Sequence, residues 1–191
     1  AEVAAALDGR LLALFTSYRM LREVHIRLKD TYAAAADLQV LGQGMESGNR
    51  TKLVRQFLSH PRGILLGTSS FWEGVDIPGR DLTGLAIVRL PFQPPNHPLF
   101  EARSEYMKAR NKNPFMQYAV PQAVIRFKQG FGRLIRTADD YGVVIVYDTR
   151  VIDTQYGKQF LYSLPGPRME HMSSEQLVPR IKAWLEEREK R

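Results

Sequence analysis

The sequence contains no cysteine and no apolar run that approaches the length of a membrane span. The absence of cysteine excludes disulfides and thiolate metal sites from this chain, and it fits a reducing compartment. A membrane-spanning helix needs ~20 consecutive, mostly apolar residues, and no signal-peptide pattern is present either. We therefore expect a cytoplasmic chain with no membrane partner.

The sequence also lacks the glycine-rich loop with which many ATPases hold phosphate. The pattern GxxxxGK[ST] does not occur, because the only Gly-Lys pair, Gly157-Lys158, is followed by Gln159. No acidic box suited to Mg²⁺ is present, and the histidines at 25, 60, 97 and 171 show no ligand spacing. We therefore predict no metal site, and we expect this chain alone to hydrolyse no ATP.

The length and charge of the chain set broad limits. Its 191 residues are long enough for one domain with a sizeable core, and we treat residues 1–191 as a single domain. The formal charge of +7 points to a polyanionic partner. This indication is weak, because the basic residues are spread along the chain rather than gathered in a block.

Short apolar runs separated by helical patterns predict an α/β fold. The runs are Leu11–Phe15, Ile64–Leu66, Leu85–Val88 and Val143–Tyr147, with a weaker one at Leu38–Leu41. They are continuous rather than alternating, which is typical of strands covered on both faces. Helical spacing follows the first run, and again follows the weaker run, where Asn49 or Ser47 can cap the helix. The alternation predicts a mainly parallel sheet flanked by helices.

Polar residues follow two of these runs, where ligands of open parallel sheets bind. Thr16 and Ser17 come after the first run, and their hydroxyls can either cap the next helix or help to hold a phosphate. After the weaker run comes Gly42-Gln43-Gly44, which is either a plain turn or backbone held open for a ligand.

The segment after Ile64–Leu66, GTSSFWEGVDIPG, is rich in both hydroxyls and acids. Thr68 and Ser69 offer small donors suited to a nucleic-acid phosphate. The carboxylates of Glu73 and Asp76 could accept hydrogen bonds from ribose or orient arginines. We expect the aromatic pair at 71–72 to pack on the core.

The stretch Gln122–Arg136 is predicted to be an amphipathic helix opened by Pro121. One stripe without any acid holds Gln122, Arg126, Gln129, Arg133 and Arg136. The opposite side holds Val120, Val124, Phe127, Phe131 and Leu134. Glycines at 130 and 132 suggest that another surface comes close, because glycine is unfavourable within a helix. Guanidinium groups bind phosphate oxygens through forked donors, so we favour phosphate recognition over a solvated face.

Prolines break up the stretch between about residues 89 and 121, which we expect to be an irregular excursion with a helix from about Pro98 to Arg110. Its aromatics interleave with cations: Phe92, Phe100, Tyr106, Phe115 and Tyr118. Such platforms suit single-stranded nucleic acid, although we expect most of them to pack. Further on, Arg150 either contacts nucleotide or pairs with Asp148 or Asp153, and a helix is predicted over about 173–191.

Several segments resemble motifs of superfamily-two helicases, most of all the DinG and XPD type. The stretch QGFGRLIR at 129–136 resembles their sixth motif, QxxGRxxR, and GTSSFWEGVDIPG at 67–79 resembles the fifth. LFTSY at 14–18 resembles the fourth motif, the Gln-Gly at 43–44 resembles the turn after it, and LPFQPPNHP at 90–98 is also similar. The resemblance runs from about Leu12 to Arg150 and implies the second of two RecA-like motor domains.

The same resemblance implies a role for each candidate residue. Arg133 and Arg136 would be arginine fingers, and the ATP site would also include Gln129, Glu73, Gly74 and Asp76. Single-stranded DNA would be held by Thr16, Ser17, Gln43, Gly44, Thr68 and Ser69. ATP and Mg²⁺ would be bound mainly by the first motor domain of the same parent chain, a 5′-to-3′ DNA helicase. The alternative is a non-motor α/β module that binds phosphorylated ligand or nucleic acid, and a phosphate loop encoded upstream of Ala1 would discriminate.

Overall fold

A five-stranded sheet organises the computed structural model, which describes residues 1–33, 37–74, 77, 81–94, 96–137 and 140–189. In chain order the strands are β1 (Arg10–Leu14), β2 (Gln39–Gly42), β3 (Gly63–Gly67), β4 (Gly84–Ile87) and β5 (Val143–Val146). Their order in space is β2-β3-β1-β4-β5, and every pairing is parallel. The five predicted runs and the mainly parallel α/β sheet are confirmed.

The register of the strands brings their carboxyl ends to one edge. Leu14 lies beside Gly67 of β3 on one side and Ile87 of β4 on the other. Gly42 at the end of β2 lies beside Leu66. The residues that follow β1, β2 and β3 therefore leave the sheet at the same edge, which we call the carboxyl edge.

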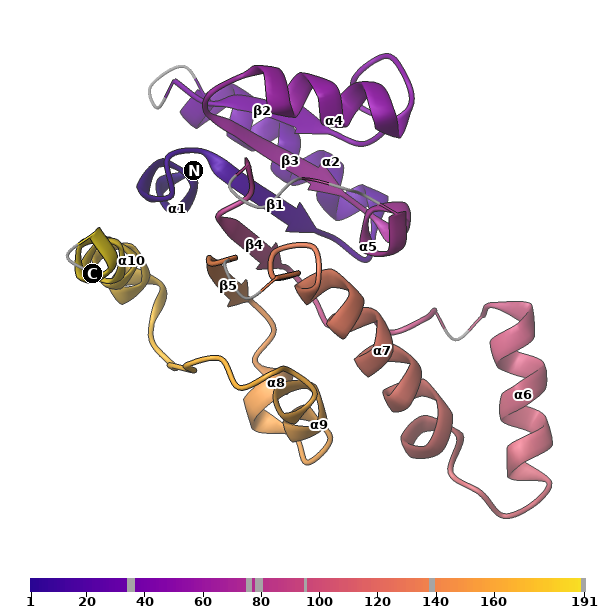
Figure 1. Cartoon of the computed structure of the whole chain (residues 1–191). Coiled ribbons are helices and arrows are strands. Elements are labelled where there is room, and N and C mark those ends of the chain that lie inside the picture. Colours follow the sequence, from indigo (N-terminus) through magenta and orange to yellow (C-terminus); the bar gives the residue numbers. More distant parts are fainter. Residues whose placement is uncertain (34–36, 75–76, 78–80, 95, 138–139, 190–191) are drawn as a thin grey trace.

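Helices cover both faces of the sheet (Figure 1). One face carries α1 (Glu2–Ala6), α2 (Tyr18–Leu28) with the π-helical η1 (Lys29–Ala33), and α10 (Ser174–Glu189). The other carries α4 (Arg50–Ser59), α5 (Ser69–Gly74), α7 (Val120–Phe131), α8 (Arg150–Asp153) and α9 (Gly157–Tyr162). Asn49 caps α4 as predicted, since its side chain accepts a hydrogen bond from the Lys52 N–H.

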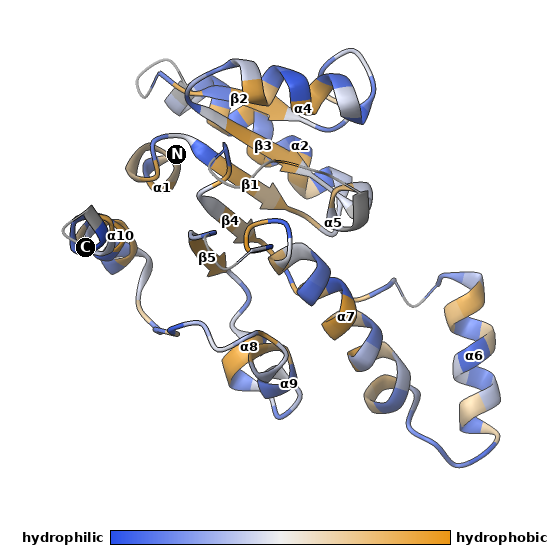
Figure 2. Ribbon diagram, viewed as in Figure 1, coloured by the Kyte–Doolittle hydropathy of each residue, from blue (hydrophilic) through white to orange (hydrophobic). Residues whose placement is uncertain are grey.

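Alternate residues of the strands face two separate cores. Leu12, Leu65 and Leu85 belong to the core under α4, α5 and α7. Their neighbours Leu11, Ile64 and Ala86 belong to the core under α1, α2 and α10. The strands are the most uniformly apolar elements in Figure 2 because both of their faces are covered. Phe71 and Trp72 of α5 are buried, as expected.

Helix α7 is amphipathic as predicted, but it ends at Phe131 rather than at Arg136. Gly132 is its C-cap, and the next residues form turns in which the Arg133 N–H donates to the Gly130 carbonyl. Two glycines within three positions weaken a helix. The Asp140 carboxylate then accepts the N–H of Arg136, which holds the chain in its new direction. The two arginines thus lie beyond the helix and do not continue its polar stripe.

The predicted helix near residue 98 is α6 (Pro98–Lys108), which lies apart from the sheet beyond α7 in Figure 1. None of its described residues is buried. It contacts the π-helical segment η3 (Phe115–Ala119), which leads into α7, through the rings of Phe100 and Tyr118. None of the helices in the described ranges is both long and apolar enough to cross a membrane.

Candidate functional site

The side chain of Gln43 connects three elements at the carboxyl edge. Its Oε1 atom accepts hydrogen bonds from the N–H and the hydroxyl of Thr68, at 2.8 and 2.9 Å. Its Nε2 atom donates to the Tyr18 hydroxyl at 2.6 Å and to the Ser70 hydroxyl at 2.9 Å. The end of β2 is thereby joined to the end of β3 and to the first residues of α2 and α5.

The other predicted DNA contacts at this edge differ in exposure. Thr16, Ser17 and Gly44 are exposed, whereas Thr68 is only 3% exposed. Ser17 occupies the N-cap position of α2, but within the described part of the chain its side chain makes no capping bond. The hydroxyl of Ser17 is thus on the surface, while the hydroxyl of Thr68 is directed into the network of Gln43.

A partly buried cluster lies behind the Gly42–Gly44 turn. The carboxylate of Glu46 is 2.9 Å from His25 Nε2 and 3.0 Å from Lys29 Nζ, and it accepts the Gly42 N–H at 2.6 Å. Partial burial acts to raise the pKa of Glu46, but the hydrogen bonds from Gly42, Lys29 and His25 outweigh it and lower the pKa. Glu46 is therefore held as a carboxylate.

Arg133, one of the predicted phosphate-binding residues, lies against a neighbouring element. Its Nε donates to the Trp72 carbonyl of α5 at 3.3 Å, and the side chain is half-buried. The Trp72 Nε1 atom in turn donates to the Phe15 carbonyl, at the end of β1, at 3.3 Å. Trp72 therefore bridges the turn after α7 and the residue that precedes Thr16.

The remaining predicted ATP-site residues, and Ser69 of the predicted DNA contacts, are less fully described. Arg136 is exposed in the segment after α7, and Gln129 is exposed on α7 itself. The backbones of Ser69, Glu73 and Gly74 belong to α5, whereas their surroundings, like the whole of Asp76, lie outside the described residues.

At the other end of the carboxyl edge, Asp148 pairs with Arg150. The carboxylate accepts bonds from Arg150 Nε at 2.9 Å, from Arg150 Nη2 at 2.6 Å and from the Leu90 N–H at 2.9 Å. Burial acts to raise the pKa of Asp148, but these bonds outweigh it and lower the pKa. Of the alternatives for Arg150, the structure has the pair with Asp148.

The sequence-based predictions missed several residues of this site. Arg50, in the first turn of α4, donates from Nη1 to the Ser70 carbonyl at 3.0 Å and places a cation beside the Gln43 network. Tyr18, Ser70, His25 and Glu46 were also missed. The hydroxyl of Tyr18 follows the Thr16-Ser17 pair directly, so its position after a strand could have identified it.

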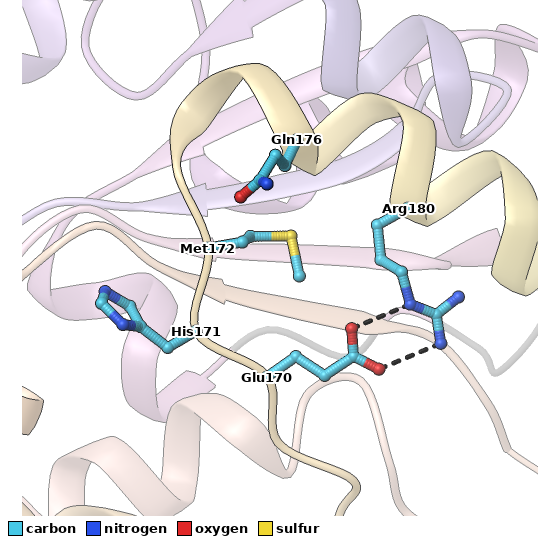
Figure 3. Close-up of a pocket in the computed structure, with 5 residues that line it drawn as sticks. All are labelled: Glu170, His171, Met172, Gln176 and Arg180. Carbon is cyan, nitrogen blue, oxygen red and sulfur yellow. Dashed lines mark hydrogen bonds and ion pairs between the residues drawn. The ribbon is translucent and has the colours of Figure 1, made fainter.

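Two cavities lie away from the Gln43 network. A hollow of 480 Å³ is lined by Glu170, His171, Met172, Gln176 and Arg180, and in Figure 3 the Glu170 carboxylate faces the Arg180 guanidinium. This hollow lies at the start of α10. Helix α10 packs on α1, the helix that precedes β1 in the chain. A larger cavity of 660 Å³ runs along β5 between the end of α7 and residues 167–184.

The arrangement at the carboxyl edge suits phosphate chemistry more than metal chemistry. Small neutral donors gather at the ends of β1, β2 and β3, and Arg133 is held by α5 close to the same edge. Hydroxyls, amides and guanidinium groups are the usual partners of phosphate oxygens. Among the described residues, no group of three or more histidine, aspartate or glutamate side chains could hold a metal ion.

Comparison with known proteins places the chain among helicase domains. The family model of the helicase C-terminal domain matches residues 1–166. The chain is 45% identical over 168 residues to the 3′-5′ exonuclease DinG of Bacillus subtilis, covering 88% of this chain and 18% of that protein. It is 44% identical over 164 residues to the ATP-dependent DNA helicase YoaA of Escherichia coli, covering 85% of this chain and 25% of that protein.

Solved structures agree on the fold. An XPD helicase structure matches with a TM-score of 0.63 at 20% identity, over 89% of this chain and 30% of that one. Domain 2 of the DEAD-box helicase Mss116p, bound to an RNA duplex, matches with a TM-score of 0.54 at 14% identity, over 94% of this chain and 63% of that one. The chain thus spans about a fifth to a quarter of the curated relatives above.

Proposed function

The chain belongs to the helicase C-terminal domain family, of the DinG and XPD type, and we propose that it is the second motor domain of an ATP-dependent DNA helicase. The exonuclease activity in the name of the Bacillus relative is not assigned to it, because the matched segment is the helicase C-terminal domain. The first motor domain, in the same parent chain, would bind most of ATP and Mg²⁺.

The contact of Trp72 with both Arg133 and Phe15 carries this proposal. Motor action requires that a phosphate-sensing group be linked mechanically to the group that holds the nucleic acid. Here one buried residue joins the two: its carbonyl accepts from Arg133 in the turn after α7, and its indole N–H donates to Phe15 at the strand end that precedes Thr16 and Ser17. A module that only binds phosphate does not need such a link.

We assign Arg133 and Arg136 to the phosphate groups of ATP held by the first motor domain. Guanidinium groups fit phosphate oxygens, and positive charge placed there stabilises the transition state of phosphoryl transfer. Hydrolysis of ATP would supply the driving force. Gln129, Glu73, Gly74 and Asp76 complete the proposed contribution of this domain to the nucleotide site.

We assign the single-stranded DNA backbone to the rim formed by Thr16, Ser17, Gln43, Gly44, Thr68 and Ser69. Three of its described members are exposed at the carboxyl edge, and Thr68 supports Gln43 from beneath. Small neutral donors can follow a phosphate backbone without reading bases. The rim therefore fits a motor that moves along strands of any sequence.

The test is DNA-stimulated ATP hydrolysis by the intact parent protein. Arg136→Ala should lower turnover by roughly 10³-fold, as the loss of an arginine finger does, while DNA binding and folding are retained. Lys128→Ala is the matched control, because Lys128 is an exposed cation in the last turn of α7, and its turnover should stay near that of the wild type. Turnover of Arg136→Ala within a few-fold of wild type would favour the non-motor phosphate- or nucleic-acid-binding module.

A further inference from the structure

The carboxylate of Glu46 connects the turn that carries Gln43 to α2 and η1. Oε2 of Glu46 accepts the Gly42 N–H at 2.6 Å, and Oε1 lies 2.9 Å from His25 Nε2 and 3.0 Å from Lys29 Nζ. The turn is bonded to further elements on each side. The Gln43 N–H donates to the Leu66 carbonyl of β3 at 2.9 Å, and Glu46 connects the turn to α2 and η1.

The packing around Glu46 leaves the turn little freedom. A Cβ atom added at Gly42 would lie 2.8 Å from His25 Cδ2, so the imidazole packs against the turn at the position of Gly42. His25 is only 4% exposed, and its Nδ1 atom has no hydrogen-bond partner among the described residues. Glu46 is the polar contact of that ring within the described part of the chain. Without it a buried imidazole would lose its partner, which is unfavourable.

The conformation of this turn decides where the Gln43 amide points. Gln43 lies between the Gly42 N–H, which Glu46 holds, and Gly44, whose φ of +76° favours glycine. Its amide must meet Thr68, Tyr18 and Ser70 at once. A small change in the backbone of the turn would break several of these bonds together.

We propose that Glu46 is a positioning residue for single-strand binding, which acts through Gln43 and does not itself touch DNA. This inference rests on the proposed DNA-binding role of the rim. Pre-organisation of a binding group lowers the entropic cost of binding. A negative charge close to a DNA backbone is by itself unfavourable for binding, and the positioning of Gln43 is a structural benefit that offsets this cost.

The direction in which Glu46→Ala changes single-strand affinity distinguishes a positioning role of Glu46 from an effect of its charge alone. Removal of an acid near a DNA-binding edge should tighten binding if only net charge matters. If Glu46 positions Gln43, Glu46→Ala should instead weaken single-strand affinity, by about five-fold. The control is Glu23→Ala, because Glu23 is an exposed acid of α2 that pairs with the exposed Arg19 at 3.1 Å. Its affinity should be unchanged or tighter.

The measurement is fluorescence anisotropy of the intact parent protein with a labelled oligonucleotide, without nucleotide present. Glu46→Gln, which keeps an oxygen for the Gly42 N–H, should lie between Glu46→Ala and the wild type and guards against loss of folding. In a Gln43→Ala background, Glu46→Ala should cause no further loss. Additive losses of affinity in the Gln43→Ala, Glu46→Ala double variant would overturn the positioning role of Glu46 but not the DNA-binding role of the rim. An affinity of Glu46→Ala equal to that of Glu23→Ala would have the same meaning. An unchanged affinity of Gln43→Ala would overturn the DNA-binding role of the rim as well.

Discussion

Gly130 of α7 faces the indole of Trp72 in α5, and a Cβ atom added at Gly130 would lie 2.8 Å from the ring atoms Cε3 and Cζ3. The close surface expected from the two glycines is therefore, for Gly130, another helix of the same domain. At Gly132 an added Cβ would lie no closer than 3.4 Å to the Lys128 carbonyl oxygen. The contact explains how α5 comes near enough for Trp72 to reach Arg133.

We predict that Gly130→Ala destabilises the domain. Alanine normally favours a helix by about 1 kcal/mol over glycine, but crowding against a buried ring costs about 1–3 kcal/mol, so the net change should be a loss. Gly132→Ala is the control, since its φ of −64° suits alanine. It should be neutral or stabilising by up to about 1 kcal/mol. Urea unfolding of both variants measures the difference, and equal stabilities would contradict the role of Trp72.

The sequence was sufficient for the strands but not for the end of α7. Continuous apolar runs such as Ile64–Leu66 reflect burial on both faces, a property of neighbouring residues that the sequence records directly. The apolar pattern that predicted a helix to Arg136 continues through Leu134, which is buried. Beyond Phe131 it does so in a turn instead of a helix, because a turn can also direct Leu134 to the core.

The candidate site was predictable in its location and not in its contacts. Positions after parallel strands identified Gln43 and Thr68 without a structure. The partners of Gln43 are 25 and 27 residues away in sequence, and their pairing depends on the strand order β2-β3-β1, which no local pattern records. The Glu46 cluster was missed for the same reason, since His25 and Glu46 come from different elements.

The aromatics of the excursion divide into packed and exposed rings, and we predict different costs for their removal. Phe92 stacks on Phe115 with centroids 5.6 Å apart and meets Phe160 at 5.8 Å. Phe92→Ala should therefore lower the free energy of unfolding by about 2–4 kcal/mol.

Tyr106 is the exposed ring to compare with Phe92. It is 60% exposed, and its contact is with Arg110, whose Cζ lies 3.5 Å from the ring centroid. Tyr106→Ala should cost at most about 1 kcal/mol. Thermal or urea unfolding measures both changes. If Tyr106→Ala proved as destabilising as Phe92→Ala, the ring would have to be packed in solution.

The Asp148–Arg150 pair should make stability depend on pH. The pKa of Asp148 is lowered in the folded protein, because the bonds from Arg150 and the Leu90 N–H outweigh burial. A lowered carboxyl pKa stabilises the fold above the pKa of the unfolded chain, and this contribution is lost as the pH falls through the folded pKa. Asp148→Asn should therefore be less stable than wild type at neutral pH, with the gap closing in acid.

The control for this pair is Asp153→Asn, which removes an exposed carboxylate from the same short helix, α8. Its stability should follow that of the wild type across the range. Chemical unfolding at a series of pH values measures both variants. A gap between Asp148→Asn and wild type that stays constant into acid would mean that the carboxylate is not the source of the stability.

The last prediction concerns the two kinds of hydroxyl at the carboxyl edge. Ser17 is exposed, so Ser17→Ala should remove a direct contact with a DNA phosphate. Thr68 is buried and donates to Gln43, so Thr68→Ala should act by loosening the Gln43 amide. Because the two residues act at separate points, the double variant should bind single strands more weakly than either single variant.

Neither route involves a base, so the loss should be similar for two oligonucleotides of unrelated sequence. Nucleotide affinity measured without DNA should stay near that of the wild type, since the arginines beyond α7 are unchanged. Fluorescence anisotropy at several salt concentrations tests this on the intact protein and on this domain, whose own binding should be weak and should fall steeply with salt. If the double variant binds both oligonucleotides as the wild type does, the rim is not in the DNA path. The basic and aromatic stretch between Phe92 and Tyr118, where Tyr106 and Arg110 are exposed, would then be the surface to test.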